Sequence, residues 1–296
     1  MKNSLFVEAA NRTESTTFAV DHPSSCEWSV KLAHFGAARR WRPRVLSIEK
    51  NTVTRFGKIR KRELAMALQE VQDFTRGMYA RVTSLWTKHR HDLSTGECGY
   101  ALISGPPQYQ PKLIIIGENP GFGVEDVGLA AHEEATWPDT SYLPTANWKL
   151  ANKLRAMFAD AGLLRLHNEA IMTNFHFFKS GSVAKDEPRA WADNDPKLRQ
   201  TLEQACVTEL REFIRLSEPE AILVLGIGAF ERFADNRCVT TEEKDVKGGR
   251  RLIVSGRLFG VPAVGIMHPT GSQIANSDIA KLSRWLGTHF TAHTAA

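Results

Sequence analysis

The sequence predicts an α/β fold in which a short, mostly parallel sheet lies between two layers of helices. Four short apolar runs, each with the length of a buried strand, lie near residues 112–117, 169–174, 220–226 and 262–267. The stretches between these runs repeat their apolar residues every three or four positions, as amphipathic helices do. Strands joined by right-handed helical crossovers would give a three-layer α/β/α sandwich.

Residues 1–60 are expected to form a basic, partly irregular extension in front of the α/β domain. They contain 11 Lys or Arg and 5 Asp or Glu, whereas the remainder of the chain is close to neutral. Such a segment would suit a phosphate backbone, with Trp41 or Phe56 available to stack on bases. A solvated basic tail, or a surface that packs on the main domain, explains the same composition equally well.

The domain is expected to span residues 61–296 and to begin with a helix. From about Arg60 to Lys88 the apolar residues recur at steps of three and four, which gives this helix one apolar face. We expect that face to pack on the sheet.

Three further helices and one extra strand complete the expected domain. Apolar periodicity indicates helices over residues 147–161, 196–216 and 277–290. Between the third and fourth strands, residues 251–254 lie between glycine-containing turns and predict an additional strand or hairpin.

The composition is that of a globular protein with a packed core, since 42% of its residues are hydrophobic. The first residues are too polar for a signal peptide, and no apolar run approaches the length of a membrane span. A cytoplasmic protein without a membrane partner is therefore expected. The four cysteines are scattered without a C-x-x-C pair, so neither a zinc site nor a disulfide framework is indicated. We expect no metal and no cofactor.

Two of the predicted strands lead directly into polar, glycine-containing turns. The first is followed by Gly-Glu-Asn-Pro-Gly at residues 117–121, and the last by His-Pro-Thr-Gly-Ser at residues 268–272. Open α/β sheets bind their ligands at the carboxyl ends of their strands. The two turns are therefore expected to form one site.

These two turns, about 150 residues apart, resemble the two signature motifs of the uracil-DNA glycosylase superfamily. The stretches at residues 170–175 and 219–226 also fit the pattern of that family, and the resemblance covers roughly residues 98–292. At the second position of the first motif, Glu118 resembles the residue of the iron-sulfur branch. At the third position, Asn119 resembles the residue of the mismatch-specific and single-strand-selective branches. The cluster cysteines of the iron-sulfur branch are missing. The resemblance implies the short-sheet sandwich of that family.

The resemblance implies two catalytic residues. Asn119 matches the first-motif residue that positions the attacking water, and as an amide it would orient that water rather than act as a strong base. His268 matches the second-motif residue that donates a hydrogen bond to a uracil carbonyl and stabilises the developing anion. An ordinary turn at Asn119 and a helix-capping role for His268 are the simpler alternatives.

The resemblance also implies the residues that bind the base. Asn174, at the end of the second predicted strand, would read the Watson-Crick edge of a flipped base with its amide. Gly117 and Gly121 would let backbone approach the substrate, and Glu118 belongs to the same motif. Alternatively, Asn174 would only satisfy buried backbone groups.

Phe122 is the candidate for stacking on the base, with Trp137 and Tyr142 as competing candidates. The loop after His268 occupies the place where relatives insert a wedge into the duplex. Its candidate DNA-binding residues are Thr270, Gly271, Ser272 and Gln273.

The function expected from the resemblance is that of a monofunctional DNA glycosylase acting on uracil or a related deaminated base in base excision repair. Its partner would be DNA, single- or double-stranded. Two alternatives remain open at this point: a catalytically inactive nucleic-acid-binding protein on the same fold, and a nucleotide or nucleoside hydrolase.

Overall fold

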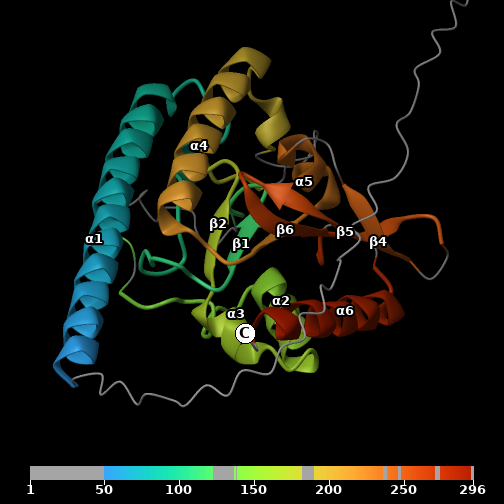
Figure 1. The fold of residues 1–296 in the computed structure, drawn as a ribbon. Coiled ribbons are helices and arrows are strands. Elements are labelled where there is room, and N and C mark those ends of the chain that lie inside the picture. Colours follow the sequence, from blue (N-terminus) through green and yellow to red (C-terminus); the bar gives the residue numbers. More distant parts are fainter. Residues whose placement is uncertain are drawn as a thin grey trace, which may run out of the picture. The chain divides into compact units, whose positions relative to one another are not determined.

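The computed structural model confirms the α/β fold and describes residues 50–122, 137, 139–181, 190–235, 239–245, 248–270 and 274–294 (Figure 1). Residues 49–296 form one compact unit. Most of the basic extension expected over residues 1–60 therefore lies outside the described residues.

Within these residues six strands form one sheet in the order β2-β1-β3-β6-β5-β4. The strands are β1 Ile114–Gly117, β2 Ile171–Asn174, β3 Ile222–Leu225, β4 Thr240–Lys244, β5 Arg251–Leu258 and β6 Val261–Ile266. The four strands predicted from apolar runs, β1, β2, β3 and β6, pair in parallel. β5 is antiparallel to both β6 and β4, so the sheet is mixed at one edge.

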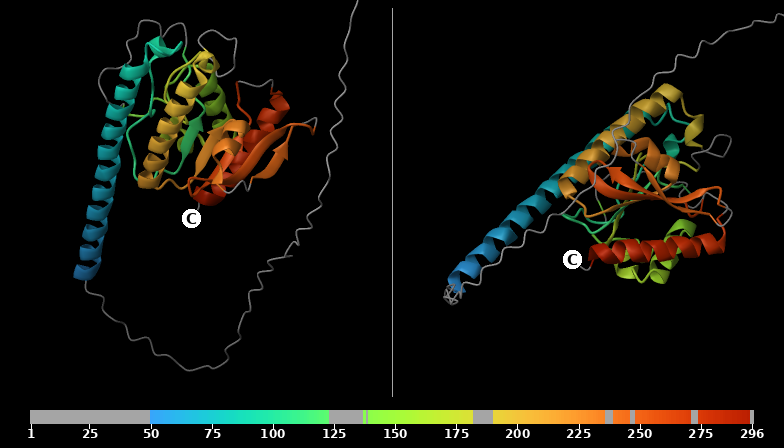
Figure 2. Two further views of the ribbon diagram at one scale, coloured as in Figure 1. Left: turned by 90° about the horizontal axis from the view of Figure 1, so that it is seen from above. Right: turned by 45° about the vertical axis from the view of Figure 1, so that its right-hand side comes forward.

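Helices cover both faces of the sheet (Figures 1 and 2). They are α1 Lys50–His89, α2 Lys149–Asp160, α3 Leu164–Glu169, α4 Pro196–Ser217, α5 Ile227–Phe233 and α6 Asn276–Thr294. α1, α4 and α5 lie on one face, and α2, α3 and α6 lie on the other. The amino-terminal part of α1 projects past the sheet (Figure 2).

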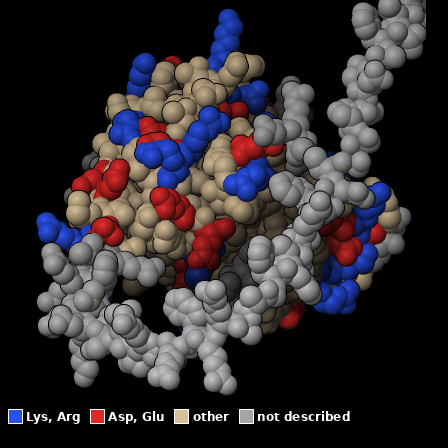
Figure 3. Space-filling view, viewed as in Figure 1, with Lys and Arg blue, Asp and Glu red and all other residues tan. Residues whose placement is uncertain are grey.

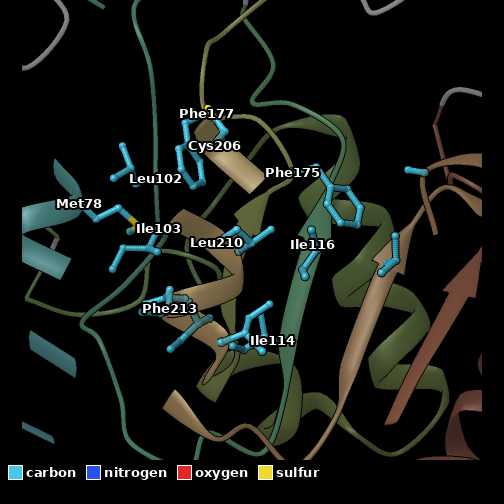
Figure 4. Packing of buried hydrophobic residues seen from close by; sticks show 14 of the residues in the cluster. Met78, Leu102, Ile103, Ile114, Ile116, Phe175, Phe177, Cys206, Leu210 and Phe213 are labelled. Atoms are coloured by element: carbon cyan, nitrogen blue, oxygen red, sulfur yellow. The ribbon is translucent and has the colours of Figure 1, made fainter. Parts of the chain in front are cut away.

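Alternate residues of the short strands supply two separate cores. Ile114, Ile116 and Val224 face the cluster shared with α1, α4 and α5, part of which is drawn in Figure 4. Ile115 and Leu223 face the cluster shared with α2, α3 and α6. Because both faces are buried, these strands read as continuous apolar runs rather than as alternating ones.

Three elements differ from the sequence expectation. α1 begins at Lys50 rather than near residue 60, because a helix can continue through residues that lack an apolar stripe. α3 is only six residues long, too short for a periodic pattern. β4 was not predicted, because all of its side chains except that of Glu243 are exposed. Its place in the sheet depends on pairing with β5.

The described surface in the view of Figure 3, which includes α1 and α4, carries interspersed charges of both signs. Several of them form ion pairs, such as Arg81 with Glu209 and Arg215 with Glu212. This face therefore lacks the uniform positive charge that favours a phosphate backbone. In the part of the chain that the structure describes, no helix is long and apolar enough to cross a membrane.

Candidate active site at the carboxyl edge of the sheet

The candidate site surrounds the carboxyl end of β1. The chain leaves β1 for β2 on one side and returns in β3 on the other, and open α/β sheets bind ligands where the strand order reverses in this way. Gly117, the last residue of β1, leads into the predicted turn at residues 118–121.

The strand register brings the two predicted turns to the same height. Ile116 pairs with Val224, and Val224 pairs with Gly265, so these three residues lie at one level of the sheet. Asn119 and His268 each follow that level by three residues. Only β3 separates their strands, so the two strand ends lie roughly 10 Å apart.

Asn174 is the last residue of β2 and lies directly beside the end of β1. It pairs with Gly117 in the β1–β2 ladder, and it is only 8% exposed. A Cβ at Gly117 would overlap its Oδ1 atom. Gly117 therefore makes room for the amide of Asn174, a steric role more specific than the backbone approach expected from sequence.

The orientation of the Asn119 amide is fixed by its hydrogen bonds. Its Nδ2 group donates to the carbonyl oxygen of Pro120 at 3.0 Å and to Oγ of Ser180 at 2.6 Å. A carbonyl oxygen can only accept, so the atom that faces Pro120 has to be the nitrogen. The remaining polar atom of the amide, Oδ1, is an acceptor suited to holding a water molecule.

The segment after β2 holds the first turn by its backbone. The N–H groups of Phe175, His176 and Ser180 donate to the carbonyls of residues 117, 118 and 120, at 3.0, 3.1 and 3.2 Å. The turn therefore continues the parallel pairing of β1 with β2 and is held in place on that side.

Glu118 points away from this backbone ladder and pairs with α5. Arg232 donates from Nη2 to its carboxylate at 2.9 Å, and both side chains are partly exposed. The guanidinium also lies over the ring of Phe233, 4.7 Å from its centroid. Phe233 in turn stacks on Phe175, with centroids 4.3 Å apart.

His176 supports the site from inside the core. Its ring stacks on Trp191 with centroids 4.8 Å apart and an angle of 18° between the planes. Burial, assisted by the positive charge of Arg232, lowers the pKa of His176 to about 3. The ring is therefore neutral at all ordinary pH values, and it is a packing residue rather than a proton donor.

His268 follows β6 and is partly buried. The backbone N–H of Thr270 donates to its Nδ1 atom at 3.3 Å. Because Nδ1 accepts in this bond, a neutral ring carries its proton on Nε2. Burial, and then the positive charge of Lys153, lower the pKa of His268 below its ordinary value. His268 is thus a neutral imidazole with an N–H donor at Nε2.

The structure places the other predicted residues as follows. Gly121 is exposed, and within the described residues a Cβ there would meet no heavy atom within 4 Å. Phe122 is partly buried. Thr270 contacts His268, as described above. Gly271, Ser272 and Gln273 lie outside the described residues.

The two competing aromatic residues have other neighbours. Arg76 of α1 lies over the ring of Trp137 at 5.2 Å. Tyr142 lies beside Trp148, with centroids 5.4 Å apart, and burial of its hydroxyl raises its pKa.

Three residues of this region were missed by the sequence analysis. Ser180 holds Asn119, Arg232 pairs with Glu118, and Lys153 of α2 donates from Nζ to the carbonyl of Pro269 at 2.8 Å. None of them belongs to a motif, and two of the three are charged residues on helices, which are usually solvated. No signal in a single sequence separates them from surface residues.

The arrangement places a hydrogen-bond acceptor and a hydrogen-bond donor at one edge of the sheet. An acceptor at Asn119 Oδ1 can orient water, and a donor at His268 Nε2 can stabilise negative charge on an oxygen at the other side of the edge. Among the described residues, no group of three or more His, Cys, Asp or Glu side chains is arranged to hold a metal ion.

Comparison with known protein families identifies a match. Residues 104–284, more than half of the chain, match the family described as the uracil DNA glycosylase superfamily. The matched region includes both turns and all four parallel strands. No curated protein matches the chain.

Proposed function

The chain belongs to the uracil DNA glycosylase superfamily, and on that premise we propose that it is a monofunctional DNA glycosylase. Its substrate is uracil, or a related deaminated base, in DNA, and its reaction begins base excision repair. The observation that carries this proposal is the placement of Asn119 and His268 at one height on the same edge of the sheet, with opposite hydrogen-bonding roles.

The reaction breaks the bond between C1′ of the deoxyribose and the nitrogen of the base. Positive charge develops on the sugar and negative charge on the departing base. A water molecule adds to C1′, the electrons of the broken bond leave with the base, and one proton of the water ends on that base. The products are a free base and an abasic site.

Each of the two residues acts on one side of this reaction. Asn119 accepts a hydrogen bond from the water through Oδ1 and so directs its lone pair at C1′. It is too weak a base to take the proton fully, which fits a reaction with an advanced positive charge on the sugar. His268 donates from Nε2 to a carbonyl oxygen of the base, where the negative charge accumulates.

Neutral His268 has an advantage in this role. Burial and the charge of Lys153 lower the pKa of His268 below its ordinary value, which favours the neutral ring with its N–H at Nε2. The donor is held in place by Thr270, so little reorganisation is needed when charge develops.

Asn174 recognises the base. Its amide offers a donor beside an acceptor, which matches the adjacent carbonyl and N–H of uracil. Cytosine presents an acceptor and an amino group on that edge instead. The space left by Gly117 and the β1–β2 pairing place this amide beside the end of β1.

The test is alkaline cleavage of labelled oligonucleotides that carry uracil in a single strand, opposite guanine, or opposite adenine. We expect wild type to produce abasic sites, and Asn119→Ala and His268→Ala each to reduce the single-turnover rate about 100- to 1000-fold. Asn152→Ala and His91→Ala, both at exposed positions, serve as matched controls with wild-type rates.

The outcomes separate this proposal from its alternatives. No cleavage of any of the three substrates, nor of oligonucleotides carrying hypoxanthine or xanthine, would contradict the glycosylase proposal. Tight, salt-sensitive DNA binding without abasic sites would then indicate a binding protein on the same fold. Release of uracil from free deoxyuridine would indicate a nucleoside hydrolase.

A further inference from the structure

A cation of α2 reaches the loop that carries His268. Lys153 lies on the second turn of α2, and its Nζ donates to the carbonyl of Pro269 at 2.8 Å. Pro269 directly follows His268, and it is 116 positions away from Lys153 in the sequence. This contact joins a helix that follows the first motif to the loop of the second.

The other cations of α2 behave differently. Arg155 donates from Nη2 to the carbonyls of Leu143 and Ala146, which lie just before its own helix. Lys149 is exposed, whereas Lys153 is partly buried. Lys153 is therefore held at the boundary between α2 and the His268 loop, a position that an ordinary solvated lysine does not take.

We propose that Lys153 is a positioning residue for His268. Lys153 anchors the backbone of the His268 loop and places a positive charge beside the imidazole. The proposal rests on the proposed function for its consequence in catalysis. Its two physical parts, the anchor and the charge, are properties of the free protein.

The anchor fixes the loop where it begins. Thr270 holds the ring of His268 from the loop itself, so the direction of Nε2 depends on where that loop lies. The bond from Lys153 ties the carbonyl between these two residues to a rigid helix. Loss of this tie would let the donor move relative to the base, and displacements of about 1 Å can cost about 100-fold in rate.

The charge acts on the protonation of the ring. After burial, the positive charge of Lys153 is the cause that lowers the pKa of His268. A neighbouring ammonium disfavours the imidazolium ion, in which both nitrogens carry protons. The acceptor at Nδ1 that binds the N–H of Thr270 is thereby preserved.

The experiment follows the His268 imidazole by NMR titration between pH 4 and 8, with the signal assigned by its absence in His268→Gln. Wild type is compared with Lys153→Gln, Lys153→Arg and the matched control Lys149→Gln. We expect Lys153→Gln to raise the pKa of His268 by about 0.5 to 1 unit, Lys153→Arg to keep it low, and Lys149→Gln to leave it unchanged.

An unchanged pKa in Lys153→Gln would overturn the proposal, and so would an equal shift in Lys149→Gln, which would indicate only the general charge of α2. If circular dichroism shows that Lys153→Gln does not fold, Lys153→Met carries the same test, because it keeps the aliphatic stem.

Single-turnover excision is the second readout. At pH 7.5, where His268 is neutral with or without Lys153, we expect Lys153→Gln to lower the rate about 10- to 100-fold through loss of the anchor. The acid limb of its pH profile should move upward by the shift seen in the titration. A wild-type rate with an unmoved acid limb would contradict a positioning role. A shifted titration in a protein that excises nothing would refute the proposed function and leave the link between Lys153 and His268 standing.

Discussion

The amide of Asn174 lies over Gly117, so close that a Cβ on the glycine would overlap its Oδ1 atom. The two residues pair in the β1–β2 ladder, and Asn174 is only 8% exposed. We therefore predict that base recognition through Asn174, as proposed above, depends on the absence of a side chain at position 117.

Gly117→Ala is expected to displace this amide and to lower the excision rate about 100-fold, comparable to the loss of a hydrogen-bonding group at the reacting centre. Single-turnover cleavage of a uracil oligonucleotide measures the effect. Gly249→Ala, in the turn between β4 and β5, is the control, since a Cβ there meets no described atom within 4 Å. Equal rates for the two variants would show that the position of Asn174 is unimportant.

Ser180→Ala is expected to lower the excision rate about 10-fold, because it removes one of the two acceptors that orient the Asn119 amide. The bond to Pro120 remains, so the loss should be smaller than for Asn119→Ala. Ser217→Ala is a matched control: this serine is also buried, and its hydroxyl bonds to Phe213 at the end of α4. If Ser180→Ala excises at the wild-type rate, Asn119 does not need Ser180.

Gly265→Ala is expected to destabilise the fold by about 1–3 kcal/mol, as overpacking of a filled core does. A Cβ there would lie 2.7 Å from Cβ of Phe230 and 2.9 Å from Cγ2 of Val254. The free energy of unfolding from urea titration measures the cost. A stability equal to wild type would mean that α5 can move away from the sheet.

His176 gives the folded protein a predictable dependence on pH. Burial keeps the pKa of its ring at about 3, against 6.5 in the unfolded chain, so the unfolded state binds an extra proton between these values. The contribution of His176 to the free energy of unfolding is therefore fully present above pH 6.5. It falls as the pH drops toward 3, by up to ~1.4 kcal/mol per pH unit.

His176→Phe keeps a ring for Trp191 to stack on but removes this proton. Its free energy of unfolding is expected to fall less than that of wild type between pH 6.5 and 4.5, in urea titrations at each pH. His91→Phe, at an exposed position, should keep the wild-type slope. Parallel slopes for wild type and His176→Phe would show that the ring titrates normally.

The strands that carry the candidate site could be predicted from the sequence. β1 and β3 are buried on both faces, so their residues are apolar without interruption, and their ends could be located from the first polar residue. Asn119 and His268 were expected at one edge for the same reason, and the strand register places them there.

The residues that hold the site could not be found in this way. Ser180 lies six positions after Asn174 in a segment without regular structure, and it meets Asn119 only because that segment runs parallel to the turn that follows β1. Lys153 occupies a helix position that periodicity assigns to a partly polar face, and its contact lies 116 residues away. Such contacts depend on tertiary structure, which local patterns do not encode.

The order of the strands also sets the order in which the two halves of the candidate site are made. β1, β2 and β3 emerge from the ribosome long before β6, which is joined to β3 by the β4–β5 hairpin. A growing chain with the first motif in place still lacks His268, and it also lacks the strand that would hold it. A truncated product that stops before β6 therefore holds only half of the candidate site, and under the proposed function we expect it to excise no base.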